Sequence, residues 1–420
     1  PDPTLPNLTV EDFSFSSSFD STGPVWARAV YPSDAVNLPL MVVQHGYGST
    51  RDAVMYSAER MALNGFFCIA VDVRGWDGSA GAHDDGGVEI MDIYDAIEET
   101  RQLYPSEVDP NLVSIIGYSN GGGNVFFSTV RFPFTFRASM ALFGVVDYGQ
   151  WITLVPNWRD DVVAAVGGTP EELPDHYFVR RSEEAASNLN GTHFHIAYDE
   201  TEWMCPPIMD QEFAAAVTPA QQENLFVHIS QSTDPARWTH AHNTTGHLNV
   251  IEDLFMADIY DNNLQTPVMP ASGSLVLLVF IVTPKFSCFL ANGDDAAATV
   301  DYDIQTDQAT FNFSPLTSDS TVTGTLTLIP DIADHDAHVY IDGVKTAVIP
   351  QGAKLEISFP ITSSVHVNTR IFGMDDLTAM ATAWLTDTPQ WDIAPTLNGD
   401  GTVNLSDFAD FASRWQPLEP

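Results

Sequence analysis

The stretch Gly117-Tyr118-Ser119-Asn120-Gly121-Gly122-Gly123 decides how the rest of the chain is interpreted. It follows the apolar run 112–116, which begins after a turn-forming Asp-Pro-Asn and is typical of a buried strand, and it precedes residues 124–130, which can continue as a helix. In such a strand-to-helix turn, a serine hydroxyl is lifted clear of the sheet, and the flanking glycines leave room for the tight backbone. The pattern predicts Ser119 as a nucleophile; the simpler alternative is a glycine-rich turn with an incidental serine.

Apolar runs and helical patterns alternate on both sides of this turn. Strands are predicted at 13–19, 25–31, 40–43, 66–71, 112–116, 138–146, 193–198 and 225–229, and helices at 53–63, 90–103 and 249–258. The first two strands alternate apolar and polar residues, as half-exposed antiparallel strands do, whereas the later ones are apolar throughout. Alternation at this pace predicts an α/β fold with a mostly parallel sheet and helices on both sides.

Residues 147–190 interrupt this rhythm with a helical segment punctuated by tryptophan and proline. An insertion at the carboxyl edge of a parallel sheet lies above a serine at that edge, so the segment is predicted to be a cap that affects substrate choice. Trp151, Trp158 and Tyr177 could line an aromatic pocket there. The alternative, which the sequence favours, is that they only pack the cap onto the sheet.

The sequence changes character twice after the predicted sheet domain, 1–264. Residues 265–372 carry short β-rich runs between Gly, Asp, Asn and Pro turns, which predicts a small antiparallel sandwich. Its predicted strands are 275–282, 298–304, 321–329, 339–341 and 355–359. Residues 373–420 contain two short amphipathic helical patterns, 380–385 and 408–415, which suggest an internal duplication.

The charge balance limits the classes of partner. The chain has 56 Asp and Glu against 16 Lys and Arg, a formal net charge of -40. Such a surface repels phosphate backbones and anionic membranes, so nucleic acid is not expected as a partner. A neutral or cationic substrate and a salty or extracellular habitat fit better, and plain solubility is an equally good explanation.

Cysteine usage and hydropathy exclude two further classes. Three cysteines, Cys68, Cys205 and Cys288, do not make a disulfide scaffold, and Cys68 and Cys205 are expected to pack as small apolar groups. The longest apolar run, 275–282, is too short to span a bilayer as a helix. No signal-peptide pattern opens the sequence at Pro1, which fits either a protein that is not exported or numbering that begins at a mature end.

A nucleophilic serine needs a base and a third group that orients the base. In doubly wound hydrolases these follow in the order serine, acid, histidine, each after a later strand. The segment from Asp199 to Pro207 resembles the G-x-x-D-x-x-V-P loop of prolyl-oligopeptidase-like and dienelactone-hydrolase-like α/β-hydrolases. Aligning its proline with Pro206 places Glu202 on the acid, with Asp199 as the alternative.

Three histidines, His240, His242 and His247, follow the last predicted strand of the sheet. Only Gly246-His247 has the Gly-His pair seen in the enzymes that this region resembles, so the resemblance favours His247 as the base. His240 also has a suitable spacing and is the alternative. A surplus histidine in such a loop more often forms a local hydrogen bond than takes part in chemistry.

The oxyanion formed during acyl transfer needs backbone N–H donors. Asn120, which follows the nucleophile, supplies one. His45-Gly46-Tyr47 resembles the H-G-x oxyanion turn of the same hydrolases, which implies that the Tyr47 N–H is the second donor. Asp72-Val73-Arg74-Gly75 resembles their D-x-R-G turn, where Arg74 is expected to be structural.

The segment from Asn398 to Asp407 resembles the calcium loop of a dockerin repeat. Oxygen ligands at alternating positions around a glycine suit Ca²⁺. The implied ligands are Asn398, Asp400, Thr402 through its carbonyl, Asn404 and Asp407. The first ligand position of the pattern is Thr396, and the earlier repeat, which ends at Asp376, has no recognisable loop, so a capped Asx turn without metal is the alternative.

The resemblance, which covers residues 40–258, implies a serine hydrolase that cleaves carboxylic esters through an acyl-enzyme and needs no cofactor for catalysis. The appended sandwich and dockerin-like tail suggest a secreted or cell-surface enzyme for polymer-linked esters of carbohydrates or polyesters, with a protein partner for the tail. A serine peptidase of the prolyl-oligopeptidase-like type is one alternative. A non-catalytic adhesion or scaffold protein with a vestigial hydrolase domain is the other.

Overall fold

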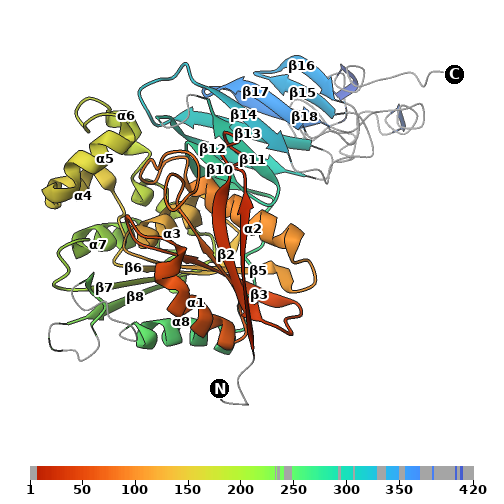
Figure 1. Cartoon of the computed structure of the whole chain (residues 1–420). Coiled ribbons are helices and arrows are strands. Elements are labelled where there is room, and N and C mark those ends of the chain that lie inside the picture. Colours follow the sequence, from red (N-terminus) through yellow and green to blue (C-terminus); the bar gives the residue numbers. More distant parts are fainter. Residues whose placement is uncertain are drawn as a thin grey trace.

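The computed structural model contains two β-sheets, one covered by helices and one folded on itself (Figure 1). It describes residues 7–231, 233, 237–240, 248–291, 295–305, 308–328, 337–349, 355–368, 381–382, 403 and 407–409. The helix-covered sheet comes first in the chain and carries the candidate site.

The first sheet has eight strands in the order β1-β2-β4-β3-β5-β6-β7-β8. The pairs β1–β2 and β2–β4 are antiparallel, and every pair from β4 to β8 is parallel. The strands are β1 (Leu8–Phe15), β2 (Val25–Pro32), β3 (Leu38–Gln44), β4 (Phe67–Val71), β5 (Val108–Tyr118), β6 (Phe136–Leu142), β7 (His193–Asp199) and β8 (Leu225–Ser230). The predicted antiparallel entry and mostly parallel sheet are confirmed.

Helices cover both faces of this sheet. Figure 1 shows α1 (Met55–Leu63) and α8 (Asn249–Asp261) together on one face, and α2 (Ile90–Leu103) and α3 (Asn120–Arg131) on the other. The bounds of α2 equal those predicted from its apolar stripe, because Ile90, Ile93 and Ile97 all point into the core. The helix α7 (Pro207–Ala216), between β7 and β8, was not predicted.

The segment between β6 and β7 is helical, as predicted for the cap. It consists of α4 (Tyr148–Leu154), a 3₁₀ turn (Pro156–Trp158), α5 (Arg159–Val166), α6 (Pro174–Phe178) and a second 3₁₀ segment (Ser182–Leu189). These helices are too short to be stable by themselves, so packing on the sheet domain stabilises them. Figure 1 shows α4, α5 and α6 grouped at one side of the sheet.

The second sheet is antiparallel and has the order β16-β15-β18-β13-β12-β9-β10-β11-β14-β17. Its strands are β9 (Ser272–Leu278), β10 (Phe280–Val282), β11 (Phe286–Leu290), β12 (Ala297–Ile304), β13 (Gln308–Pro315), β14 (Thr323–Leu328), β15 (Ala337–Ile341), β16 (Val344–Ile349), β17 (Leu355–Pro360) and β18 (Ser364–Asn368). Strands far apart in this order face each other: the Phe313 and Phe359 ring centroids are 4.1 Å apart, and those of Phe286 and Phe311 are 5.0 Å apart. The sheet thus folds over one apolar core, as expected for a small sandwich.

The single strand predicted over 275–282 is wrong in one respect, because the structure divides it into β9 and β10. Val279 lies between them with a φ of 68°, in the left-handed region that valine rarely adopts. The break turns Phe280 and its neighbours toward the first domain. Apolar periodicity cannot reveal such a break, since every residue in the run is apolar.

The sandwich packs directly on the α2/α3 side of the sheet domain. The Phe280 ring lies 5.9 Å from that of Phe132 and 6.3 Å from that of Phe19, and the Arg131 guanidinium lies 5.0 Å from the Phe280 ring centroid. Asn188 adds two hydrogen bonds, donating to the Val276 carbonyl at 2.6 Å and accepting from its N–H at 2.9 Å. The two domains therefore share a packed interface.

Most of the predicted C-terminal module lies outside the described residues. This holds for Asn398, Asp400, Thr402 and Asn404, four of the expected calcium ligands, while Asp407 is described and buried. In the described part of the chain, no group of three or more His, Cys, Asp or Glu side chains is arranged to hold a metal ion. No helix among the described residues combines the length and hydropathy needed to cross a membrane.

Candidate active site

Ser119 lies in a sharp turn between β5, which ends at Tyr118, and α3, which begins at Asn120. Its φ of 58° and ψ of -122° place a non-glycine residue in a strained conformation. Two backbone hydrogen bonds hold it there: the Ser119 N–H donates to the Leu142 carbonyl at 3.0 Å, and the Ser119 carbonyl accepts from Gly123 at 3.0 Å. The predicted elbow is present, with the hydroxyl at the end of the strand.

Gly117 and Gly121 permit the tight turn. A Cβ at Gly117 would lie 2.1 Å from the Gly121 carbonyl oxygen, and one at Gly121 would lie 2.4 Å from the Gln44 carbonyl oxygen. No side chain can be accommodated at such distances from backbone atoms. The backbone of α3 therefore contacts β5 and the end of β3 directly, which explains why the motif requires glycine at both positions.

His240 is the histidine that the structure brings to this serine. Its Nε2 lies 2.7 Å from Ser119 Oγ, and its ring packs against Phe143 with centroids 4.7 Å apart. It was the alternative base in the sequence analysis; the favoured His247, like His242, lies outside the described residues. The described geometry thus supports the alternative.

Glu202 lies on the other side of the His240 ring, as the alignment of Pro206 implied. Its Oε1 is 3.1 Å from His240 Nδ1, at an angle that departs from a straight hydrogen bond, and its Oε2 accepts the His240 backbone N–H at 2.9 Å. Oε1 also accepts the Met204 N–H at 2.8 Å. Burial alone would raise the pKa of this carboxyl, but the hydrogen bonds from His240 and from the Met204 N–H outweigh burial and lower it, so Glu202 is ionised.

Asp199, the alternative acid, is occupied elsewhere. Its Oδ2 accepts from Arg237 Nε at 2.8 Å and from Ser230 Oγ at 2.7 Å, and its Oδ1 accepts from Thr201. Burial opposes ionisation, but these contacts, with Arg237 foremost, hold the pKa of Asp199 far below its usual value. Asp199 therefore anchors the loop that presents Glu202.

The two expected oxyanion donors flank Ser119. Asn120 is the first residue of α3, so its N–H belongs to the free amides of a helix N-terminus. Tyr47 follows Gly46, which is so close to the serine that a Cβ there would lie 3.3 Å from Ser119 Cβ. The Asn120 side chain points elsewhere, since its Oδ1 accepts the Tyr148 hydroxyl at 2.5 Å.

His45 orients the turn that carries Tyr47. Its Nδ1 lies 2.9 Å from the Gly46 carbonyl oxygen, and its Nε2 lies 3.4 Å from the Val73 N–H. Burial lowers the pKa of His45 to about 4, so the ring is neutral, with Nδ1 as donor and Nε2 as acceptor. The Gly46 carbonyl belongs to the same peptide unit as the Tyr47 N–H, so this hydrogen bond fixes the direction of the expected oxyanion donor.

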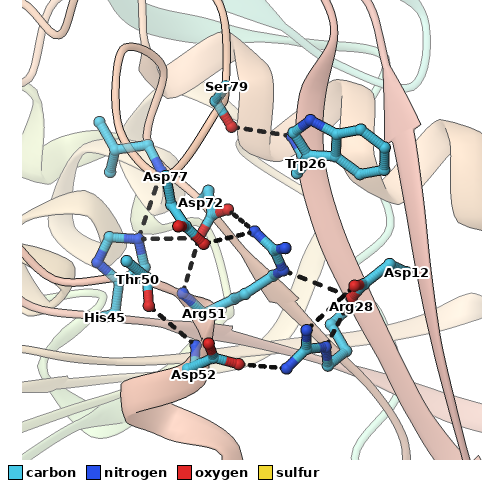
Figure 2. A network of polar contacts seen from close by, with 11 residues as sticks. Asp12, Trp26, Arg28, His45, Thr50, Arg51, Asp52, Asp72, Asp77 and Ser79 are labelled. Carbon is cyan, nitrogen blue, oxygen red and sulfur yellow. Dashed lines mark hydrogen bonds and ion pairs between the residues drawn. The ribbon is translucent and has the colours of Figure 1, made fainter.

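An ion-pair network lies beside His45 (Figure 2). Arg51 contacts the buried carboxylate of Asp72 and also Asp12, which Arg28 binds through Nε at 2.6 Å. His45 Nε2 lies 3.8 Å from Asp72 Oδ1 at the edge of the network. The network thus ties β1 and β2 to the loops that follow β3 and β4.

The described side-chain contacts of Arg74 lie outside the site. Its guanidinium donates to both oxygens of the buried Asp92, at 2.6 and 2.7 Å, and to Asp20 at 2.8 Å. These contacts join the loop after β4 to α2 and to the loop after β1, which is the structural role expected from the resemblance.

A pocket of about 280 Å³ opens above Ser119. Its lining consists of Gly46, Tyr47, Ser49, Ala53, Val54, Ser57, Tyr118, Ser119, Trp151, Trp158, Met204, Cys205, His240 and Leu248. Trp151 and Trp158 stack with centroids 5.8 Å apart, and Trp151 Nε1 donates to the Met204 carbonyl at 2.6 Å, which links the cap to the acid loop. Tyr177, also suggested for an aromatic pocket, is not part of the lining and donates to the Gly168 carbonyl.

Three residues of the pocket floor and its support carry no signal of this role in the sequence. Ser57 and Tyr118 line the pocket, and both donate hydrogen bonds to Glu252 on α8. Ser57 and Glu252 are 195 positions apart, and no motif connects them. Cys205 also lines the pocket, where burial and then the charge of Glu202 raise its thiol pKa well above its usual value.

The chain is similar to known proteins over part of its length. Residues 25–193 match the family model of the X-Pro dipeptidyl-peptidases, S15 family. The quorum-quenching protein AidA of Acinetobacter baumannii is 30% identical in an alignment of 143 positions that covers 30% of this chain and 46% of AidA. The chain therefore spans about half the length of this curated relative.

Similarity to solved structures extends over about three fifths of the chain. The acylaminoacyl peptidase of Pyrococcus horikoshii superposes with a TM-score of 0.51 at 18% identity, covering 63% of this chain and 43% of that one. The acetyl xylan esterase of Paenibacillus sp. R4 gives a TM-score of 0.45 at 17% identity, covering 61% and 86%. The first likeness identifies an α/β-hydrolase fold, and together with the family match it supports a serine hydrolase.

Proposed function

We propose that this chain is a serine hydrolase that cleaves carboxylic esters through an acyl-enzyme. The observation that carries the proposal is the 2.7 Å contact between Ser119 Oγ and His240 Nε2, made on a strained elbow at the mouth of a pocket. A solvent-exposed serine without a catalytic role has no base within hydrogen-bond reach of its hydroxyl. A serine that only stabilises a turn needs no pocket above it.

The proposed mechanism assigns one role to each group. His240 Nε2 takes the proton of Ser119 Oγ as the oxygen attacks the ester carbonyl carbon. Glu202, 3.1 Å from His240 Nδ1, stabilises the imidazolium that forms, while the Tyr47 and Asn120 N–H groups stabilise the oxyanion. His240 then gives its proton to the leaving alcohol, and water hydrolyses the acyl-serine by the same steps in reverse.

The choice of His240 over His247 depends on distance. A base has to be within hydrogen-bond reach of the proton that it removes, and His240 already is. A single imidazole between a serine and a carboxylate completes the triad, so the mechanism has no role for a second base. His247 remains a histidine of the same loop without an assigned function.

The peptidase alternative is favoured by a specific observation, the match of residues 25–193 to the S15 peptidase family. Ester and amide hydrolysis use the same triad, so the geometry of Ser119 does not separate them. Trp151, Trp158, Val54 and Leu248 give part of the pocket wall an aromatic and apolar character, which suits a small acyl or alcohol group. We therefore place esters first and peptides second, and a non-catalytic scaffold role third.

The finer assignments from the sequence are proposals that depend on the accompanying domains. They comprise polymer-linked esters of carbohydrates or polyesters as substrates, a secreted or cell-surface location, and a protein partner for the C-terminal module. Calcium bound by Asn398, Asp400, Thr402, Asn404 and Asp407 belongs to the same group of proposals. Catalysis itself is proposed to need no cofactor, because Ser119 supplies the nucleophile, His240 carries out the proton transfers, and Glu202 orients His240 and stabilises its charged form.

One set of assays tests the proposal. Wild type and Ser119→Ala are compared on a panel of chromogenic esters of increasing acyl length and on peptide p-nitroanilides, and both are treated with a fluorophosphonate. We expect ester turnover and labelling in the wild type, with kcat lower by roughly 10⁴-fold or more in the variant. Faster turnover of the anilides would establish the peptidase, and a wild type that neither turns over nor labels would favour the scaffold protein.

A further inference from the structure

The pocket floor beside Ser119 is supported by a buried carboxylate. Glu252, on the first turn of α8, is 1% exposed. Its Oε1 accepts from Ser57 Oγ and from the Tyr118 hydroxyl, each at 2.7 Å, while its Oε2 pairs with Arg60. One carboxylate thus joins α1, α8 and the residue immediately before the nucleophile.

The chemistry of this group fixes the direction of both hydrogen bonds. A carboxylate paired with a guanidinium only accepts, so each hydroxyl has to donate its one proton to Glu252. Burial and then the negative charge of Glu252 hold the pKa of the Tyr118 phenol well above its usual value, so this proton stays on Tyr118. Neither hydroxyl retains a proton for any other partner.

Ser57 and Tyr118 also line the pocket, where they are 8% and 6% exposed. Because their protons point toward Glu252, what remains for a bound molecule is the lone pairs of their two oxygens. The lining also contains the apolar side chains of Val54 and Leu248. The Ser57 and Tyr118 oxygens can therefore accept hydrogen bonds from a ligand but cannot donate them.

We propose that Ser57 and Tyr118 form a subsite, beside Ser119, for a hydrogen-bond donor on the substrate, such as a hydroxyl or an ammonium group. The inference rests on the proposed function and specifies the substrate class of the same site. A methyl group there leaves the lone pairs of both hydroxyl oxygens without a donor, although the hydroxyls still donate to Glu252. A carbonyl or carboxylate oxygen there would be repelled, because it too offers only lone pairs. Glu252 is the positioning residue that sets the polarity of the subsite.

A substrate series tests the subsite in the wild-type protein. Three p-nitrophenyl esters with acyl chains of equal length end in a methyl, a hydroxyl or an ammonium group, and a second series carries the same three ends on the alcohol part. We expect kcat/KM for the hydroxyl ester to exceed that for the methyl ester by about tenfold in one of the series. The ammonium arm shows whether a positive charge adds to or subtracts from the preference for a donor.

Two variants locate the preference. Ser57→Ala and Tyr118→Phe each remove one acceptor, so the hydroxyl-to-methyl ratio of kcat/KM is expected to fall severalfold in each. Ser49→Ala is the matched control, because Ser49 lines the same pocket and is expected to keep the wild-type ratio. The hydroxyl-to-methyl ratio of kcat/KM is measured within one variant, so a loss of folded protein or of general activity cancels. Ser57 also lies on α1, away from the backbone of the elbow.

The outcomes separate the subsite from the proposed function. Equal kcat/KM for the methyl and hydroxyl esters in both series overturns the subsite while ester hydrolysis stands. A wild-type preference that survives in both Ser57→Ala and Tyr118→Phe also overturns it, because other residues then select the donor. If no ester is turned over and a fluorophosphonate does not label Ser119, the proposed function fails, and the subsite fails with it.

Discussion

Two groups of histidine and carboxylate lie near opposite ends of β7, and within the described part of the chain only one of them has a serine beside it. After the carboxyl end of the strand, Glu202 faces His240, which contacts Ser119. Near the amino end, His195 Nε2 lies 3.1 Å from Asp258 Oδ2 on α8. Both pairs are partly or fully buried, and both place an imidazole against a carboxylate.

The three histidines of the amino-end group form one connected cluster with Asp258. His193 Nδ1 lies 2.9 Å from the same Asp258 oxygen, and His195 Nδ1 lies 3.0 Å from His228 Nε2. With the carboxylate as acceptor, the tautomers follow: His228 donates to His195, and His193 and His195 both donate to Asp258. Every nitrogen of His195 is therefore committed to a neighbour.

The difference shows which feature marks a reactive histidine. A buried histidine–carboxylate pair is equally good at holding a helix to a sheet and at orienting a general base. What distinguishes His240 is the group at its second nitrogen, a hydroxyl that faces a pocket, where His195 has another imidazole. The group at the second ring nitrogen of the histidine therefore indicates a catalytic role, whereas the histidine–carboxylate pair alone does not.

The largest expected effect comes from exchanging the two histidines for alanine. His240→Ala is expected to lower kcat for ester hydrolysis by roughly 10⁴- to 10⁶-fold with little change in Tm, because it removes the base. His195→Ala is expected to retain kcat within severalfold and to lose about 2 kcal/mol of unfolding free energy, because it leaves His228 and Asp258 short of a partner. Steady-state kinetics and denaturant titration of both variants measure this, and similar loss of kcat in both would abolish the distinction.

The two carboxylates give a smaller contrast. Glu202→Gln preserves shape but presents an amide to His240, so kcat is expected to fall by roughly 10² to 10⁴-fold while KM changes little. Asp258→Asn is the matched change at the other end and is expected to lower Tm without a comparable loss of kcat. A Glu202→Gln enzyme with wild-type kcat would exclude Glu202 from the triad.

The amino-end cluster predicts a pH effect on stability. Burial lowers the pKa of His228 to about 4 and also lowers that of His195, whereas both titrate near their ordinary value in the unfolded chain. Above about pH 6.5 neither state binds these protons; below it the unfolded state binds them first, so stability falls from about pH 6.5 down to about pH 4. Tm measured across this interval should decrease more steeply in wild type than in His228→Gln.

That experiment needs both wild type and His228→Gln, because two buried carboxyl groups also change the stability of the protein in this pH range. Burial raises the pKa of Glu183 to about 7, and burial together with the charge of Asp84 raises that of Glu89 to about 7, so these carboxyls add stability as the pH falls. They contribute equally to wild type and to His228→Gln, and the difference between the two curves isolates the histidine. Parallel curves would show that His228 is not protected from protonation in the folded state.

The smallest effect is expected at the cap. Trp151→Phe keeps an aromatic ring but loses the hydrogen bond to the Met204 carbonyl, so KM is expected to rise by roughly three- to tenfold with a smaller change in kcat. Trp158→Phe removes no such bond and serves as the control. Equal kinetic parameters in the two variants would mean that the link between cap and acid loop does not shape the pocket.

The sequence predicted those parts of the fold and site that depend on local pattern. The elbow is local, since a strand, two glycines and a helix start within a few residues define it. The bounds of α2 follow from its apolar stripe, and the alternation of strands and helices gave the parallel sheet. Glu202 was placed by a proline four residues further along the chain.

The parts that depend on distant contacts were not predictable. The choice between His240 and His247 depends on where a loop passes in space, which no residue pattern in the loop encodes. The link between Ser57 and Glu252 spans 195 positions. The break at Val279 is a change of backbone conformation inside an apolar run, where no residue type signals it. The histidines of the amino-end cluster come from two strands, and no local pattern connects the strands.

The packing of Phe280 on the sheet domain bears on how this protein can be shortened. A cut at the boundary predicted at residue 264 would uncover the rings of Phe19 and Phe132 and the guanidinium of Arg131, and would leave Asn188 without the Val276 backbone. The sandwich therefore covers an apolar face of the sheet domain, and a shortened chain would need polar replacements at those positions to avoid self-association through the uncovered surface.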